Sequence, residues 1–79
     1  MDYSFENLKQ DLSIGREIEF NYSGRKFSIT NTPVGWSLAE YYKDDIQVFS
    51  SHQDLLQYGN IDGKVLQDIW SLVTVETIY

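Results

Sequence analysis

Hydrophobic and polar residues alternate over residues 16–30, a pattern that predicts a half-buried β-hairpin. The apolar residues of the first strand share one face, and Ser23 with Gly24 supplies a two-residue turn. A tight turn places each of these residues opposite an apolar or amphipathic partner on the same face. The predicted cross-strand pairs are Tyr22 with Arg25, Phe20 with Phe27, and Ile18 with Ile29. A slip of one residue would destroy this match, so the pattern fixes the register.

A third strand is predicted over residues 36–41, after a turn at residues 31–35 that contains the only proline. An antiparallel return of the chain gives three further cross-strand neighbours. They are Ile29 with Trp36, Phe27 with Leu38, and Arg25 with Glu40. Trp36 and Leu38 then belong to the core, whereas Tyr41 lies on the opposite face of the strand.

Two segments before and after these strands have the start signals of helices. The first helix covers residues 3–12, and Asp2 or Ser4 caps its start. The second begins after Ser50 or Ser51, since an aspartate lies three residues beyond Ser51 in an arrangement similar to a capping box. Both helices are expected to be short, because a glycine follows each apolar stripe.

A third helix is predicted to begin at its cap, Asp62, and to bury one stripe of apolar side chains. The stripe comprises Val65, Leu66, Ile69, Trp70 and Val73. Residues 73–79 alternate again and predict a closing strand, while Ile46 and Val48 indicate a short fourth strand of the meander.

These elements together predict an α+β fold. An antiparallel β-meander plus a C-terminal strand is expected to pack against about three short helices in a two-layer sandwich. A chain of 79 residues is expected to form one domain, residues 1–79. Its hydrophobic content of 42% suffices for one compact core.

Net charge and cysteine content indicate the cellular compartment and the kind of partner. Twelve acidic and six basic side chains give a formal net charge of −6, which repels phosphate backbones and anionic lipids and attracts a basic partner. The absence of cysteine excludes disulfides and thiolate metal sites and is typical of a reducing cytoplasm. No apolar run approaches the ~20 residues of a membrane span, and the N-terminus lacks a signal-peptide pattern. We therefore expect a soluble cytoplasmic protein.

No catalytic, cofactor or metal site is predicted. The only histidine, His52, adjoins Ser51, but neighbouring residues on a helix do not face one another. Asp44 and Asp45 lack the spaced oxygen ligands of a calcium site and the His and Cys ligands of a zinc site. The Gly-Lys pair ending at Lys64 lacks the other residues of a phosphate-binding loop. We therefore expect a protein that is not an enzyme.

The outer face of the predicted meander is the candidate interaction surface. Glu17 and Glu19 make this face acidic, while Ala39, Tyr41 and Phe49 gather toward the third and fourth strands. Such a patch is either covered by a helix or free to bind. The candidate residues are Tyr41, Phe49, Glu17 and Glu19, and their acidic setting favours a basic protein partner.

Single-stranded nucleic-acid binding by the first hairpin is the alternative function. Arg16, Arg25 and Lys26 lie on or beside this hairpin, and Tyr22 and Tyr41 offer rings for stacking on bases. The two glutamates of the outer face weigh against it, because a stacking sheet needs a positive field.

Three segments carry a family resemblance: IGREIEFNYSGRKFSIT, GWSLAEYY and IDGKVLQDIW, at residues 14–30, 35–42 and 61–70. The chain resembles small uncharacterised proteins of Gram-positive bacteria and their prophages. The resemblance implies no catalytic residues. A mobile-element setting favours a small protein that acts by binding a host protein, as an antitoxin or an inhibitor of a defence enzyme does.

Overall fold

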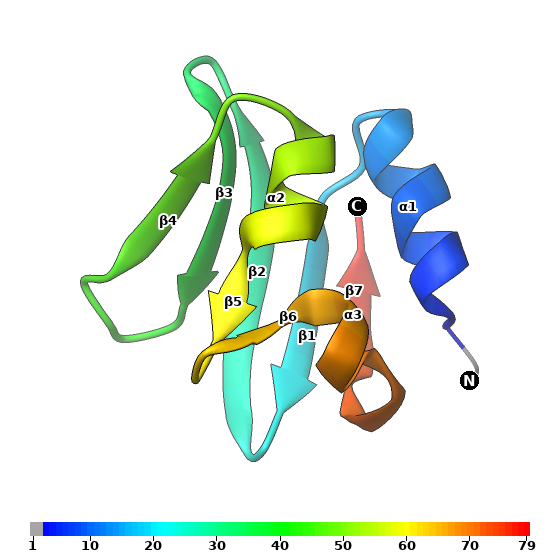
Figure 1. Cartoon of the computed structure of the whole chain (residues 1–79), viewed down its shortest axis with the longest axis vertical. Coiled ribbons are helices and arrows are strands. Elements are labelled where there is room, and N and C mark those ends of the chain that lie inside the picture. The colour runs from blue at the N-terminus through cyan, green and yellow to red at the C-terminus, as the bar shows by residue number, and fades with distance from the viewer. Residues whose placement is uncertain (1–2) are drawn as a thin grey trace.

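A five-stranded antiparallel sheet forms one layer of the protein, whose computed structural model describes residues 3–79 (Figure 1). The strands lie in the order β4-β3-β2-β1-β7. Their bounds are β1 Ile18–Tyr22, β2 Arg25–Thr32, β3 Gly35–Glu40, β4 Ile46–Phe49 and β7 Thr74–Ile78. The meander and the closing strand predicted from the alternation are thus confirmed.

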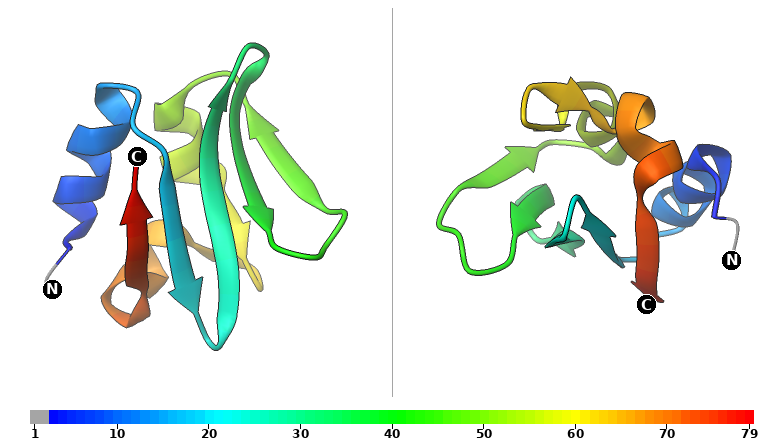
Figure 2. Two further views of the ribbon diagram at one scale, coloured as in Figure 1. Left: turned by 180° about the vertical axis from the view of Figure 1, so that it is seen from behind. Right: turned by 90° about the horizontal axis from the view of Figure 1, so that it is seen from below.

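Helices and a small hairpin form the second layer, on one face of the sheet (Figures 1 and 2). They are α1 Phe5–Ser13, α2 His52–Tyr58, α3 Leu66–Ile69 and the 3-10 helix η1 Trp70–Leu72, with the hairpin β5 Asn60–Ile61 and β6 Lys64–Val65. The fold is therefore α+β, as predicted. Within the described residues, no helix is long and apolar enough to cross a membrane.

Serine hydroxyls begin the two longer helices, because each satisfies a backbone N–H that the first turn leaves free. Ser4 Oγ accepts from the backbone N–H of the residue three positions later at 3.0 Å, and Ser51 Oγ does so at 3.1 Å. Both serines were among the predicted caps. The other candidate for α1, Asp2, lies outside the described residues.

The core lies between the two layers and includes both tryptophans, as predicted. Trp36 is 7% exposed and Trp70 is 4% exposed. The ring of Trp70 meets Phe20 edge-on at 5.2 Å between centroids, and its Nε1 donates to the carbonyl of Tyr3 at 3.0 Å. The buried residues are Leu8, Leu12, Ile18, Phe20, Phe27, Ile29, Trp36, Leu38, Leu55, Ile61, Leu66, Ile69 and Trp70.

The first hairpin has the predicted register, with Phe20 opposite Phe27 and Ile18 opposite Ile29. The register between β2 and β3 differs from the prediction by two residues: Ile29 pairs with Leu38, and not with Trp36. The turn is shorter than expected, because the β-ladder continues to the pair formed by Thr32 and Gly35. An even shift keeps every side chain on its face, so the predicted core survives the error.

Asp62 does not cap a helix, and the prediction of a long third helix is wrong. Asp62 and Gly63 have φ of 56° and 80° and form the two-residue turn between β5 and β6. Asp-Gly favours this turn, since both central residues must adopt positive φ. The helix begins only at Leu66 and ends at Ile69.

Candidate functional site

The sheet face opposite the helices, here called the outer face, carries no other element among residues 3–79 (Figure 2). Cross-strand partners share a face, so the register defines its members. They include Glu19, Asn21, Lys26, Ser28, Thr30, Ser37, Ala39, Tyr41, Ile46, Val48 and Thr77. The candidate surface is therefore not covered by a described helix.

Tyr41 lies at the centre of a polar network on this face. Its backbone N–H donates to the carbonyl of Lys26 at 2.9 Å, which extends the ladder between β3 and β2 by one residue. Its hydroxyl donates to Glu19 Oε2 on β1. Lys26 Nζ lies 4.8 Å from the centroid of the Tyr41 ring and 3.9 Å from a carboxylate oxygen of both Glu19 and Glu76. The network links the end of β3 to the three strands that follow it in the sheet, β2, β1 and β7, and holds the ring of Tyr41 in place.

The same contacts set the protonation of the network. The hydrogen bond to Glu19 raises the pKa of Tyr41 to about 12. The reciprocal effect of Tyr41, followed by the bond from Tyr79 and the charge of Lys26, lowers the pKa of Glu19. At neutral pH the tyrosine is a donor and the glutamate is charged, so the contact between them is a charge-assisted hydrogen bond.

Three of the four predicted surface residues lie on or beside the outer face. Glu19 and Tyr41 belong to it, and Glu17 precedes β1 and accepts a hydrogen bond from the Asn31 N–H at 2.9 Å. The prediction for Phe49 is wrong. This residue pairs with Trp36 and packs against the core on the helix-covered face.

Two aliphatic residues take the place of Phe49 on the outer face. Ile46 pairs with Ala39 and Val48 with Ser37, and the two side chains are 58% and 56% exposed. The prediction failed because a short strand with three apolar residues in four positions does not reveal which of them face outward. Only the register of β4 with β3 shows which of these side chains face outward.

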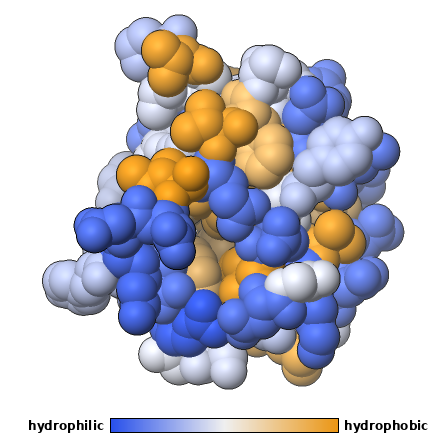
Figure 3. Space-filling model, turned by 60° about the vertical axis from the view of Figure 1, so that its left-hand side comes forward, coloured by the Kyte–Doolittle hydropathy of each residue, from blue (hydrophilic) through white to orange (hydrophobic). Residues whose placement is uncertain are grey.

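A cleft of about 370 Å³ opens on the other side of the sheet, between β3, β4 and the small hairpin (Figure 3). Its apolar lining comes from Phe27, Leu38 and Ile61. Both hydrophilic and hydrophobic groups border this hollow in Figure 3.

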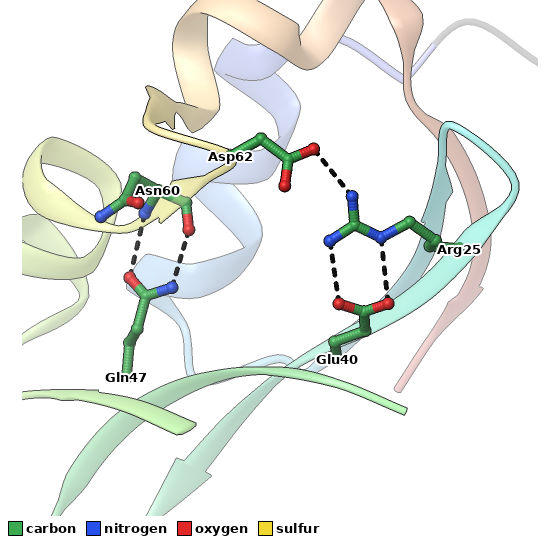
Figure 4. A network of polar contacts seen from close by, with 5 residues as sticks. All are labelled: Arg25, Glu40, Gln47, Asn60 and Asp62. Atoms are coloured by element: carbon green, nitrogen blue, oxygen red, sulfur yellow. Dashed lines mark hydrogen bonds and ion pairs between the residues drawn. The ribbon is translucent and has the colours of Figure 1, made fainter. Parts of the chain in front are cut away.

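Two polar contacts beside the cleft hold the hairpin on the sheet (Figure 4). Arg25 donates to both carboxylate oxygens of Glu40, at 3.0 and 2.9 Å, and to Asp62 at 2.7 Å. Gln47 donates to the carbonyl of Asn60 at 2.7 Å and accepts from its N–H at 3.0 Å. The sequence predicted the proximity of Arg25 and Glu40, whereas no signal in the sequence indicated the contact of Gln47 with Asn60. Both contacts brace β3 and β4 from the helix side.

The basic residues of the first hairpin are each matched by two carboxylates. Arg25 contacts Glu40 and Asp62, whose hydrogen bonds raise its pKa. Lys26 faces Glu19 and Glu76. The local charge around each cation is therefore negative, and the hairpin does not provide the positive field that a nucleic-acid backbone requires.

The side chains of Ser51 and His52 have different contacts. The hydroxyl of Ser51 caps α2, while the ring of His52 meets Trp36 edge-on at 6.0 Å between centroids. The Nδ1 atom of His52 is buried and has no hydrogen-bond partner in the described part of the chain. Residues 3–79 also contain no group of three or more His, Cys, Asp or Glu side chains placed to hold a metal ion.

Comparisons with known proteins give no family assignment. No family model, curated protein or solved structure matches the chain. What the outer face binds is therefore inferred from its own chemistry.

Proposed function

We propose that this protein is a small, acidic, non-enzymatic interaction domain that binds a basic protein through the outer face of its sheet. The main support comes from one open face of the sheet. This face combines a tyrosine held in place by hydrogen bonds, Tyr41, with two exposed aliphatic side chains, Ile46 and Val48. Tyrosine is enriched at protein interfaces, and exposed apolar patches with a polar rim are typical of them.

Charge supports a basic partner. The chain carries a formal net charge of −6, and the face contributes Glu19 and Glu76 against Lys26. A surface of this sign accelerates the approach of a basic protein and rejects acidic ones. The resemblance to proteins of Gram-positive bacteria and their prophages further favours a role in inhibiting or modulating a host protein. Binding by the first hairpin to single-stranded nucleic acid has less support, because each hairpin cation already meets two carboxylates.

Affinity capture from a lysate of a Gram-positive bacterium tests the proposal. The baits are the wild-type protein, the double variant Ile46→Ser with Val48→Ser, and the control Leu72→Ser. Leu72 is 71% exposed and belongs to η1, away from the outer face, so the control removes a comparable exposed aliphatic group.

We expect the wild type and the control to retain a basic protein that the double variant does not retain. Retention should fall as the salt concentration rises. Equal retention by all three baits, or loss by the control as well, would exclude the outer face. Capture of nucleic acid in place of protein would favour the alternative function.

A further inference from the structure

The open edge of the sheet lies at β4. The sheet has two edge strands, β4 and β7, and α1 lies beyond β7 whereas no described element lies beyond β4 (Figures 1 and 2). An edge strand presents unpaired N–H and C=O groups that can pair with another chain. β4 is therefore the exposed pairing edge of this sheet.

The backbone groups that face this edge can be assigned from the ladder. In an antiparallel pair, alternate residues direct both backbone groups toward the partner strand. Because Tyr41 bonds to β2, the even-numbered residues of β3 face β4, and they pair with Gln47 and Phe49. The N–H and C=O of Ile46 and Val48 consequently point to the open edge.

β4 lacks most of the features that protect natural sheet edges. Its sequence, IQVF, contains no charge and no proline, and its outward side chains are more than half exposed. Only its length of four residues limits pairing. The strand is also held in place, because Gln47 forms two hydrogen bonds with Asn60. Binding a partner would therefore cost β4 little further conformational entropy.

Two acidic residues, Asp44 and Asp45, stand immediately before the strand. Both are exposed, and neither forms an ion pair within residues 3–79. A segment paired with β4 would therefore find apolar neighbours at Ile46 and Val48 and uncompensated negative charge at one end.

We infer that the basic partner docks by adding an extended segment antiparallel to β4, with aliphatic side chains on the outer face and Lys or Arg beside Asp44 and Asp45. This inference rests on the proposed function and specifies how the partner binds. Main-chain hydrogen bonds to Ile46 and Val48 supply affinity, and the charges set direction. A second copy of the chain fits less well, because each copy carries −6 and offers no cation in its own β4.

The test uses the synthetic peptide Thr-Val-Thr-Val-Lys-Lys, blocked at both ends, whose lysines reach Asp44 and Asp45 in the antiparallel orientation. Amide hydrogen exchange is measured by NMR with and without it. In the free protein the amides of Gln47 and Phe49 should exchange slowly and those of Ile46 and Val48 quickly. Saturating peptide should slow exchange at the latter two residues by at least about tenfold.

Val48→Pro is the decisive variant. It removes an N–H that faces solvent and leaves the bonds to β3 in place, which an edge strand tolerates. It should weaken peptide binding by at least about tenfold, since two edge bonds are lost or strained. The matched control Val48→Thr keeps the N–H and the β-branched shape, and should bind within about threefold of wild type. Asp44→Asn with Asp45→Asn should weaken binding and reduce its salt dependence.

Undiminished binding to a folded Val48→Pro protein, exchange protection elsewhere, or no binding at millimolar peptide would overturn the inference. Capture from lysate that still depends on Ile46 and Val48 would then leave the proposed function standing with a different docking mode. Sedimentation of the wild type as a dimer and of Val48→Pro as a monomer would replace the partner segment by a second copy.

Discussion

Replacing Trp70 by alanine should unfold much of the population, because this side chain joins the two layers. It is 4% exposed, meets the ring of Phe20 at 5.2 Å and donates to the carbonyl of Tyr3 at 3.0 Å. Truncating a buried Trp typically costs ~3–5 kcal/mol. A domain of this size has a total stability of about 5 kcal/mol, so the expected loss approaches the whole.

Trp70→Phe divides this cost into two parts. A phenyl ring keeps the contact with Phe20 but leaves the carbonyl of Tyr3 without its donor. We expect a loss of about 1–2 kcal/mol, from the hydrogen bond and the smaller ring. Leu72→Ala, at an exposed position two residues away, should change stability by less than about 0.5 kcal/mol.

Urea unfolding followed by far-ultraviolet circular dichroism measures all three variants on one scale, since it does not depend on the tryptophan removed. The predicted order of free energies of unfolding is Leu72→Ala, then Trp70→Phe, then Trp70→Ala, from most to least stable. A Trp70→Ala protein within about 1 kcal/mol of wild type would refute the placement of this ring between the layers.

Three further predictions concern the outer face and the strands that carry it. The difference between the spectrophotometric titrations of the wild type and Tyr41→Phe should show Tyr41 ionising near a pKa of about 12, and in a Glu19→Gln background the same difference should move toward the ordinary tyrosine value; an unchanged difference would disprove the contact. Because the folded pKa of Tyr41 is the higher one, the part of the stabilisation that depends on its protonated hydroxyl is complete below the pKa of an unfolded tyrosine and is lost as pH rises through about 12. Because the folded pKa of Glu19 is the lower one, the part that depends on its carboxylate is present above the pKa of an unfolded glutamate and is lost as pH falls through the folded value. Gly35→Ala should cost at least about 2 kcal/mol in urea unfolding, since a Cβ at φ +135° would lie 2.2 Å from a backbone oxygen at the end of β4; a neutral result would show that the strands are not this close. Gln47→Ala should speed amide exchange at Asn60, whereas an unaltered rate would mean that the hairpin is held by other contacts.

Local patterns were sufficient for the first hairpin and for the starts of the two longer helices, α1 and α2. The register of β1 with β2 follows from two signals that agree, the alternation of apolar and polar residues and the two-residue turn that begins at Ser23. Ser51 was predictable as a cap because the hydrogen bond it accepts comes from a residue three positions away. The placement of Trp36 in the core was also correct, despite a wrong partner, because a two-residue shift preserves the face.

The errors arose where a local signal has two meanings or where distant segments meet. Asp62 occurs both at helix starts and in tight turns, and the following glycine decided for the turn. The orientation of Phe49 depends on the pairing of β4 with β3, which a short strand does not reveal. The contact of Gln47 with Asn60 joins residues thirteen positions apart through a backbone that no side-chain pattern marks.

Cross-saturation from an unlabelled captured partner to the isotope-labelled protein shows directly which face is in contact, because it reports on individual amide groups. We expect the amide signals of the outer face and of Ile46 and Val48 to lose intensity, while those of α1 and α2 keep it. Loss of intensity confined to the helices, with the outer face unaffected, would contradict it.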